Sequence, residues 1–268
     1  MMHVAEYMGY RTLRFERRER VLRVTIDRAG VLNAINEEMH DDLSRVFEEI
    51  NRDEGCDVVV LTGAGKAFCA GGDMRWFQSM IDEPARFRAI APAAKRIVFS
   101  LLELEKPIIC RLNGAAAGLG ATIALMCDVI IAADTAVIGD PHVRMGLVAG
   151  DGGAVIWPQL IGFARAKELL MTGDMLTAEQ AERLGLINHV VPLAELDATV
   201  DAMADKLASG ATWAIRWTKT VANISLRRLA HELMDAANAY EMMTNQTADH
   251  QEAVTAFREK RKPKFTGK

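Results

Sequence analysis

Apolar residues follow two different spacings along the first half of this chain. Short apolar runs of strand length alternate with longer segments in which apolar residues recur every three or four positions. Residues 12–15 and 21–27 alternate between apolar and polar side chains around the polar stretch 17–20, which predicts a hairpin. Asn36 is suited to cap a helix that runs to about Asn51. The chain is therefore expected to begin with a hairpin followed by a helix.

The alternation of strands and helices continues beyond this helix. A buried strand is predicted at residues 58–62, and another directly after Pro107. Asp73 opens a short helical stretch, and a longer amphipathic helix is predicted over residues 84–104. Two further short strands are predicted at residues 129–132 and 136–138.

Beyond Thr177 the pattern becomes almost wholly helical. Thr177 and Gln180 have the spacing of a capping box, in which each side chain bonds the backbone N–H of the other residue. Strands that alternate with helices, followed by helices alone, predict an α/β core with a C-terminal helical region. We place the core and its active site in residues 1–200 and the helical region in residues 201–268.

Composition and charge narrow the class of protein. The chain has 268 residues, of which 50% are hydrophobic and 25% charged, so it can bury a sizeable core. Its net charge of −4 gives no support to nucleic-acid binding, which needs a basic surface. The longest uncharged apolar run, residues 114–127, is too short to span a bilayer. We therefore expect neither a nucleic-acid nor a membrane partner.

The N-terminal segment and the cysteines indicate a cytoplasmic protein. Residues 1–10 include Glu6 and have no apolar core of signal-peptide length. The 4 cysteines lie among apolar or small residues with no C-x-x-C pair, as expected for reduced, buried thiols.

Two turns rich in glycine and alanine are the strongest chemical signal in the chain. The first spans residues 67–73 and the second residues 113–120, and each follows a strand and precedes a helix. Small residues let a backbone approach a ligand closely and leave N–H groups at the helix start that point at it. The backbone N–H groups of Gly72 and Leu119 would together stabilise an enolate or a tetrahedral oxyanion.

Common nucleotide and zinc motifs do not fit the chain. The stretch Gly63-Ala64-Gly65-Lys66 lacks the spacing of a phosphate loop. Ile123 stands where a dinucleotide fingerprint that starts at Gly118 needs its third glycine. The 6 histidines show no H-x-x-x-H or H-E-x-x-H spacing. We therefore expect no metal and no nicotinamide or nucleotide-hydrolysing activity.

Taken together, these motifs resemble the crotonase superfamily, the enoyl-CoA hydratase/isomerase family. The resemblance extends over nearly the whole chain, and it is the combination of motifs that makes it specific. The matching segments are Asn33-Ala34, Leu61-Thr62-Gly63, residues 66–73, Lys106-Pro107, Asn113-Gly114, Met126-Cys127-Asp128, Gly152-Gly153 and residues 170–173.

The resemblance implies a fold, an assembly and a substrate class. The fold is a spiral of ββα turns with a helical C-terminal trimerisation region, and the assembly is a homotrimer or a dimer of trimers. The substrate is an acyl-CoA thioester, so coenzyme A arrives as part of the substrate and no separate cofactor is needed. The N–H groups of Gly72 and Leu119 hold the thioester carbonyl. Contacts with the substrate are implied for Ala67, Phe68, Ala70, Gly71, Asp73, Met74, Gly118 and Gly120.

The chain departs from the family pattern at its proton-transfer positions. In the hydratases of this family two glutamates share a water across the double bond, one as acid and one as base. The motif matches place Thr122 at the first glutamate position and His142 at the second. Threonine has no useful pKa for proton transfer, so hydration by two carboxylates is not expected here.

His142 and Asp151 are the predicted replacement for the two glutamates. They flank the turn between Gly146 and Gly150, which could fold Asp151 back onto the imidazole, so that Asp151 fixes its tautomer and His142 acts as the general base. This arrangement resembles the crotonase-fold β-diketone hydrolases, which use a His and an Asp in this region to activate water for carbon–carbon cleavage. That branch uses a further histidine for which this sequence offers no obvious counterpart. Asp140, beside a proline, is expected to be a turn residue.

Three functions remain open at this point. The first is an acyl-CoA lyase or isomerase in which His142 and Asp151 transfer the protons, with Thr122 beside them. The second is a CoA-independent β-diketone hydrolase that uses the same pair. The third is a non-catalytic homologue that binds RNA or a protein, against which the acidic charge and the retained glycine turns argue. The basic residues 258–268 are either a solvated tail or a contact for CoA phosphates.

Overall fold

The computed structural model describes residues 2–3 and 7–268 of the chain. Met1 and residues 4–6, part of the N-terminal segment considered above for an export signal, lie outside the described residues. The strands form one sheet in the order β1-β2-β3-β4-β6-β8-β11 and a second in the order β10-β9-β7-β5. The first sheet contains β1 (Met2–His3), β2 (Leu13–Arg18), β3 (Val21–Ile26), β4 (Val58–Gly63), β6 (Ile108–Leu112), β8 (Val129–Ala133) and β11 (His189–Val191).

The second sheet is shorter and lies beside the first. Its strands are parallel except for the antiparallel β10–β9 pair. In the first sheet, the strands from β3 to β11 are all parallel. Three successive turns of the chain, β4–β5, β6–β7 and β8–β9, each add one strand to each sheet before helical segments follow, which gives the predicted spiral. The strands of the second sheet are β5 (Ala67–Cys69), β7 (Ala115–Ala117), β9 (Val137–Gly139) and β10 (Met175–Thr177).

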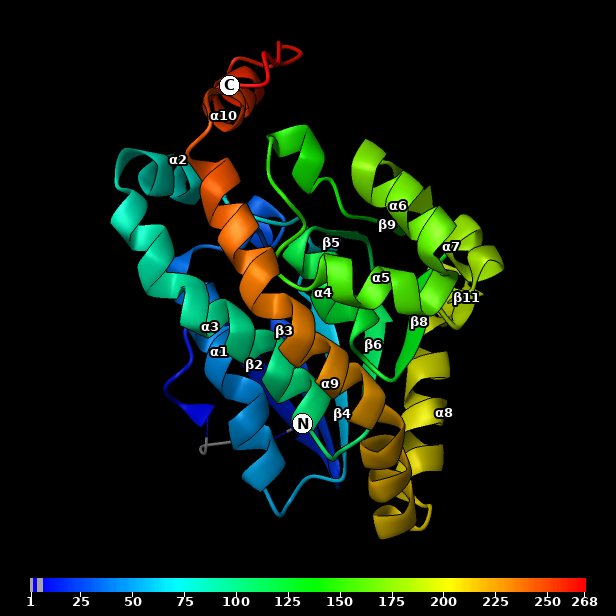
Figure 1. Ribbon diagram of the computed structural model, residues 1–268. Helices are drawn as coiled ribbons and strands as arrows, with labels where there is room; N and C mark the ends of the chain where they lie inside the picture. The colour runs from blue at the N-terminus through cyan, green and yellow to red at the C-terminus, as the bar shows by residue number, and fades with distance from the viewer. Residues whose placement is uncertain (1, 4–6) are drawn as a thin grey trace.

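Helices cover both faces of the first sheet (Figure 1). Helices α1, α3 and α9 lie side by side, whereas α8 packs against β3, β4, β6 and β8. Because β4 is covered on both faces, all six of its residues are buried, as is usual for a central parallel strand. The helices are α1 (Glu37–Arg52), α2 (Met74–Asp82), α3 (Pro84–Glu103), α4 (Leu119–Leu125), α5 (Gly153–Ile161), α6 (Phe163–Thr172), α7 (Ala178–Leu184), α8 (Leu196–Ala208), α9 (Thr212–Asn245) and α10 (Ala248–Arg258), with short 3-10 turns η2 (Ala29–Val31), η3 (His142–Met145) and η4 (Leu193–Glu195).

Several local predictions are confirmed. Strands β2 and β3 form the expected antiparallel hairpin. The side chain of Asn36 caps α1 by accepting the Met39 N–H at 3.0 Å. Thr177 and Gln180 make the reciprocal bonds of a capping box at the start of α7. Local hydrogen-bonding residues therefore fix these helix starts.

Two short strands differ from the prediction. Residues 115–117 were expected to be part of a glycine–alanine turn, but they form β7 between β5 and β9. Alanine has low strand propensity, so pairing on both sides overrides the local preference. Similarly, β11 interrupts the helical C-terminal part by pairing with β8.

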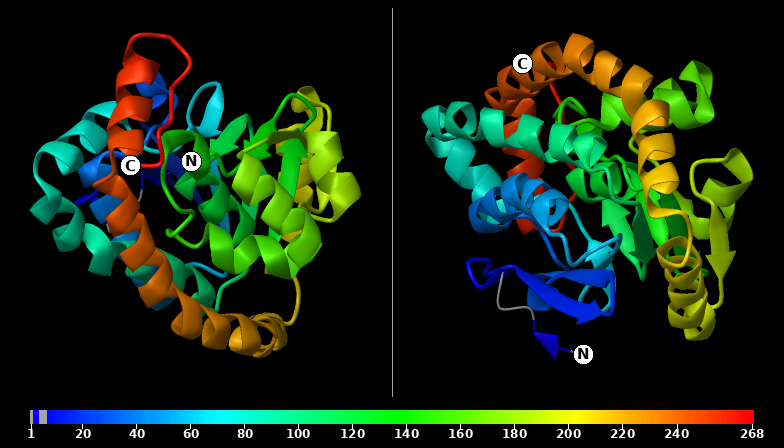
Figure 2. Two further views of the ribbon diagram at one scale, coloured as in Figure 1. Left: turned by 45° about the horizontal axis from the view of Figure 1, so that its top comes forward. Right: turned by 90° about the horizontal axis from the view of Figure 1, so that it is seen from below.

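The C-terminal helices fold back over the core. Helix α9 is 34 residues long and curves along one side of the molecule before it leads into α10 (Figure 2). It contacts α3 and α5, while α10 contacts α2 and η3. The expected boundary at residue 200 falls inside α8, which packs on the first sheet. Within residues 2–3 and 7–268, no helix is both long enough and apolar enough to cross a membrane.

Candidate active site

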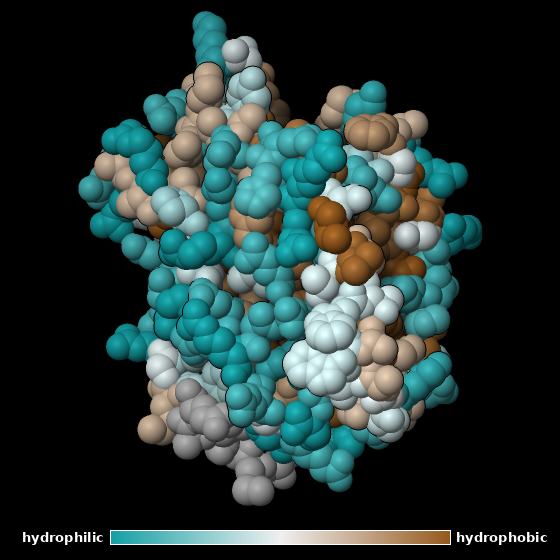
Figure 3. Space-filling view, turned by 60° about the horizontal axis from the view of Figure 1, so that its bottom comes forward, coloured by the Kyte–Doolittle hydropathy of each residue, from teal (hydrophilic) through white to brown (hydrophobic). Residues whose placement is uncertain are grey.

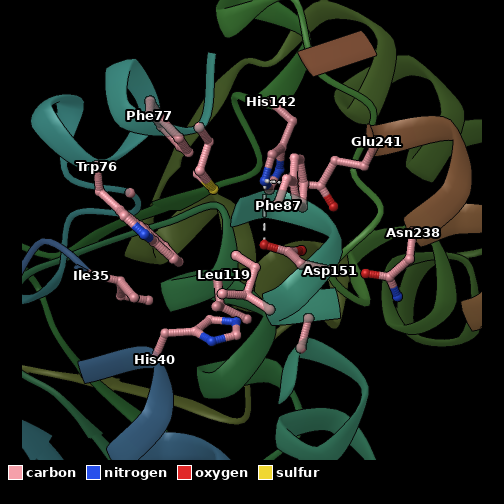
Figure 4. A pocket seen from close by; sticks show the side chains of 14 residues that line it. Ile35, His40, Trp76, Phe77, Phe87, Leu119, His142, Asp151, Asn238 and Glu241 are labelled. Carbon is pink, nitrogen blue, oxygen red and sulfur yellow. Dashed lines mark ion pairs between the residues drawn. The ribbon is translucent and has the colours of Figure 1, made fainter. Parts of the chain in front are cut away.

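A pocket lies where the first glycine turn, α4, η3 and α9 meet. His142, Asp151, Glu241 and Asn238 lie on one side of it and Ile35, Trp76 and Phe77 on the other (Figure 4). The remaining lining residues are His40, Gly72, Met80, Phe87, Ile90, Ala94 and Leu119. The pocket is therefore apolar on one wall and rich in ionisable groups on the other.

The structure places both predicted oxyanion donors, Gly72 and Leu119, in the wall of this pocket. Within the described part of the chain, neither of their N–H groups donates to a protein acceptor. A side chain at residue 72 would clash, because a Cβ there would lie 2.2 Å from Cζ of Phe77. Gly118, directly before α4, has a φ of 54° and lies under the His142 ring. Two main-chain donors are thus available to a ligand beside His142.

A second, larger groove of about 1580 Å³ meets the pocket at Gly72. Of the predicted substrate contacts, Ala70, Asp73 and Met74 line this groove. Asp73 also caps α2, where its side chain accepts the Arg75 N–H at 2.9 Å. The other lining residues are Val31, Leu32, Ala34, Arg75, Gln78, Phe257, Arg258 and Lys260.

The remaining predicted contacts lie behind the walls. Ala67 and Phe68 are buried in β5, where their carbonyls accept the Asn33 side-chain N–H groups at 2.8 and 3.2 Å. A Cβ at Gly120 would lie 2.5 Å from the Cys69 carbonyl oxygen, so glycine is required for α4 to approach β5. Gly71 has a φ of 92° and faces the β7 backbone. These residues shape the site through the backbone and not through ligand-facing side chains.

The loop after η3 brings His142 and Asp151 together. Nε2 of His142 lies 3.2 Å from Oδ2 of Asp151. Thr122 is fully buried, and its hydroxyl donates to Oδ1 of Asp151 at 3.3 Å. Helix α5 starts after Gly152, and the Asp151 side chain does not cap it. Asp151 is therefore oriented toward the pocket by His142 and Thr122.

Asp140, the expected turn residue, lies between β9 and η3 and is buried there. It is 2% exposed, and its Oδ1 contacts Nδ1 of His142 in a hydrogen bond. Its Oδ2 lies against Gly153, the first residue of α5, and a helix N-terminus favours a carboxylate. The side chain is buried because the chain turns inward after β9. A dipeptide pattern gives no information about that direction.

Carboxylates face both nitrogens of His142. Burial by itself lowers the pKa of His142, but Asp140 and Asp151 outweigh burial, so the pKa lies well above its usual value. At neutral pH the ring is therefore an imidazolium that holds a proton at Nε2, beside the Asp151 carboxylate, so His142 is an acid here and not the general base that was expected. An acid and a base thus stand next to each other in the wall of the pocket.

The ligand atoms of Asp140, His142 and Asp151 all lie within 4.8 Å of one another, a spacing that could hold a metal ion. A metal would need a bare imidazole nitrogen. Both nitrogens of His142 already lie at hydrogen-bonding or ion-pair distance from a carboxylate. The geometry therefore suits a proton better than a metal.

A second histidine, His40, also lines the pocket, although it was not predicted as a site residue. It is 3% exposed, and its ring centroid lies 5.3 Å from that of Trp76. Burial lowers the pKa of His40 to about 4, so the ring is neutral at pH 7. One sequence signal was available, since His40 shares the buried face of α1 with Leu43 and Phe47.

Glu241 enters the pocket from α9 and was also missed. It is 7% exposed, and its Oε1 lies 4.0 Å from Nε2 of His142. Burial, with Asp151 as a further cause, raises the pKa of Glu241 to about 8, so the carboxyl is protonated at pH 7. Gly150 makes this approach possible, because a Cβ there would lie 2.7 Å from the Glu241 side chain. No local pattern links residues so distant in the chain.

Comparison with known proteins identifies the family. The model of the family described as enoyl-CoA hydratase/isomerase matches residues 16–268. The 1,2-epoxyphenylacetyl-CoA isomerase of Escherichia coli (strain K12) is 35% identical over 252 residues, which cover 92% of this chain and 95% of that protein.

Two solved structures extend the comparison. An enoyl-CoA hydratase/isomerase from Mycobacterium paratuberculosis matches with a TM-score of 0.88 at 32% identity, over 92% of this chain and 98% of that one. A beta-diketone hydrolase from the cyanobacterium Anabaena sp. PCC 7120, bound to (S)-3-oxocyclohexyl acetic acid, matches with a TM-score of 0.85 at 30% identity. The match covers 92% of this chain and 98% of that one. They confirm the predicted crotonase-like α/β fold with its C-terminal helical region. The chain belongs to the enoyl-CoA hydratase/isomerase family of the crotonase superfamily.

Proposed function

We propose that this enzyme acts on an acyl-CoA thioester, holds its carbonyl at the N–H groups of Gly72 and Leu119, and moves protons with His142 and Asp151. One observation carries the proposal. Two unpaired main-chain donors and a buried acid–base pair line the same pocket. A thioester carbonyl that becomes an enolate needs these two kinds of group together.

The groove beside the pocket suits coenzyme A. It meets the pocket at Gly72, so a thioester held there would place its acyl group inside and its CoA portion outside. Arg75, Arg258 and Lys260 line the groove and offer positive charge to the CoA phosphates. This supports the expectation that the basic C-terminal residues contact coenzyme A.

The proposed chemistry is proton transfer through an enolate. The Asp151 carboxylate takes the proton from the carbon next to the thioester carbonyl, and the electron pair moves onto the carbonyl oxygen. Two N–H donors stabilise this oxyanion, each by about 3–4 kcal/mol in a water-excluded site. The His142 imidazolium then delivers a proton to the carbon skeleton. The pair thereby replaces the two glutamates, and Thr122 keeps Asp151 in position.

Titration with acetoacetyl-CoA in a calorimeter tests this proposal, because the enolate of this thioester carries the charge that the site should stabilise. Micromolar binding is expected for the wild type. A matched titration with free coenzyme A should show much weaker binding, since it lacks the carbonyl. Equal affinity for both ligands, or no binding of either, would contradict the proposal.

A second candidate is hydrolysis of a β-diketone without coenzyme A. His40 favours it, because a neutral imidazole in the pocket can donate to a second carbonyl oxygen. Water activated by Asp151 would add to one carbonyl carbon. The carbon–carbon bond would then break to leave an enolate, and His142 would protonate this enolate. The products are a ketone and a carboxylate. Ring opening of a 2,2-disubstituted cyclohexane-1,3-dione by an enzyme that does not bind acetoacetyl-CoA would establish this alternative.

We also propose that the chain assembles as a homotrimer or a dimer of trimers. Helix α9 exposes an apolar stripe on the side of the molecule shown in Figure 3, where pale and brown side chains form a band. Its residues recur at helical spacing and are half exposed or more. They are Trp213, Trp217, Val221 and Ile224. Light scattering should give three or six copies per particle, and a monomer would contradict the proposal.

A further inference from the structure

Helix α10 contacts two parts of the pocket wall that come from distant segments of the chain. It packs against α2, which begins shortly after Gly72, and against η3, which begins at His142. Gly72 and His142 both line the pocket, one with a main-chain donor and one with a side-chain acid. The first turn of α10 contains His250, which is fully buried. This histidine contacts both α2 and η3.

The first contact of His250 is with η3. Its Nδ1 lies 2.6 Å from the carbonyl oxygen of Met145, the last residue of η3. Because a carbonyl only accepts, Nδ1 carries the proton and donates it. Gly146 lets α10 come this close, since a Cβ there would lie 2.9 Å from the His250 backbone nitrogen. The bond therefore holds α10 to the single short turn that carries His142.

The second contact of His250 is with α2. Its ring meets the Phe77 ring edge to face, with the centroids 5.7 Å apart and an angle of 80° between the planes. The Phe77 ring in turn lies over Gly72, because a Cβ on that residue would lie 2.2 Å from Cζ of Phe77. His250 thus supports the ring that packs on the Gly72 turn.

The chemistry of a neutral histidine suits both contacts. Burial lowers the pKa of His250, and together with the nearby His142 imidazolium it outweighs the Met145 carbonyl, which raises the pKa. The ring is therefore neutral at pH 7 and has one N–H group. Phenylalanine has a ring without a donor, and asparagine has a donor without a ring. Histidine supplies both.

We propose that His250 is a positioning residue, which sets the distance between His142 and the N–H group of Gly72. It does so through Met145 on one side and Phe77 on the other, and it does not itself line the pocket. The inference deepens the proposed function and rests on it. A displacement of about 1 Å between reacting groups can slow a reaction about 100-fold, so a fixed distance between these two groups matters for proton transfer.

Two replacements of His250 separate its contacts. His250→Phe keeps a ring and loses the donor, whereas His250→Asn keeps an N–H group near the place of Nδ1 and loses the ring. The readouts are exchange of the α-hydrogens of hexanoyl-CoA in D₂O at saturating ligand, followed by NMR, and calorimetric binding of acetoacetyl-CoA. His250→Phe should slow exchange at least about tenfold and change the affinity less than about threefold, because η3 is released and the Gly72 turn is not. His250→Asn should recover most of the lost exchange.

His231→Phe is the matched control. His231 lies on α9, where its ring centroid is 4.4 Å from that of Phe99, and neither residue lines the pocket. This variant should keep both the exchange rate and the affinity. Gly146→Ala tests the same contact from η3. Its Cβ would push α10 away, so exchange should fall as in His250→Phe.

The outcomes separate the inference from the proposed function. If the wild type neither exchanges the α-hydrogens nor binds acetoacetyl-CoA, the proposed function fails. If the wild type exchanges them and His250→Phe does so within about threefold of its rate, the inference is overturned and the proposed function stands. Equal losses of exchange and affinity in both His250 variants also overturn the inference, because His250 would then only hold the fold together. Slow exchange with intact binding in His250→Phe, recovered in His250→Asn, supports it.

Discussion

Two parts of the pocket are built in different ways. The part that would hold the carbonyl consists of main-chain N–H groups, from Gly72 two residues before α2 and from Leu119 at the start of α4. The part that would transfer protons consists of side chains from three separate parts of the chain, His142, Asp151 and Glu241, with Thr122 bonded to Asp151 from behind the wall. Main-chain donors depend on the fold, whereas side chains can be replaced without changing it. The comparison explains how a family fold can keep its oxyanion site while its proton-transfer groups change.

The largest expected effect comes from a change in the side chains that would transfer protons. Asp151→Asn removes the base and leaves the shape almost unchanged, so we expect turnover of an accepted acyl-CoA to fall by about 10²–10⁴-fold. Binding of acetoacetyl-CoA should change by less than about tenfold, since the carbonyl donors remain. Stopped-flow kinetics and calorimetry measure the two effects. Turnover within threefold of the wild type would remove Asp151 from the mechanism.

Gly72→Ala tests the main-chain N–H groups that would hold the carbonyl. A Cβ at this residue would lie 2.2 Å from Cζ of Phe77, so either the Phe77 ring or the turn that carries the N–H group must move. Turnover should fall by about 10²–10³-fold, the usual effect of losing one oxyanion donor. Gly9→Ala is the control, because no atom lies within 4 Å of a Cβ at that residue. Equal activity of the two variants would argue against Gly72 as a donor.

Glu241 makes the stability of the folded protein depend on pH. Its pKa is about 8 in the folded protein and about 4.3 in an unfolded chain, so the folded state retains a proton that the unfolded state loses. The stability from this group is complete below pH 4 and is lost as the pH rises toward 8. Urea denaturation at pH 5 and pH 8.5 should show a larger loss of stability for the wild type than for Glu241→Gln. Identical losses would show that Glu241 is ionised when folded.

The smallest effect is expected for Thr122→Val. Thr122 donates one hydrogen bond to Asp151 at 3.3 Å and does not line the pocket. Loss of such a bond costs about 0.5–1.5 kcal/mol, so turnover should fall by less than about tenfold. A loss as large as that of Asp151→Asn would give Thr122 a direct role in the reaction.

The main-chain N–H groups of the pocket could be predicted from the sequence more completely than its ionisable side chains. Glycine and alanine turns leave a local pattern, so Gly72 and Leu119 could be singled out as candidate donors, and the structure places both in the wall of the pocket. Asp151 could be paired with His142 because only a short turn separates them. Asp140 was expected only to be a turn residue, because a residue before proline is typical of a turn and does not reveal its contact with His142.

His40 and Glu241 could not be assigned to the pocket from local sequence patterns. His40 lies on the buried face of a helix, where a histidine is usually a core residue with a satisfied hydrogen bond. Glu241 lies on a long helix with many polar residues, and only the packing of α9 against Gly150 makes it part of the pocket. Such residues become visible only when the packing of distant elements is known.

Exchange of the α-hydrogens of hexanoyl-CoA in D₂O, followed by NMR, tests the central claim most directly. It requires an enolate and a base but no further reaction. We predict that the wild type catalyses the exchange and that Asp151→Asn, with hexanoyl-CoA still bound, is at least about 100-fold slower. Exchange by Asp151→Asn at the wild-type rate would contradict the account, because another group would then be removing the proton.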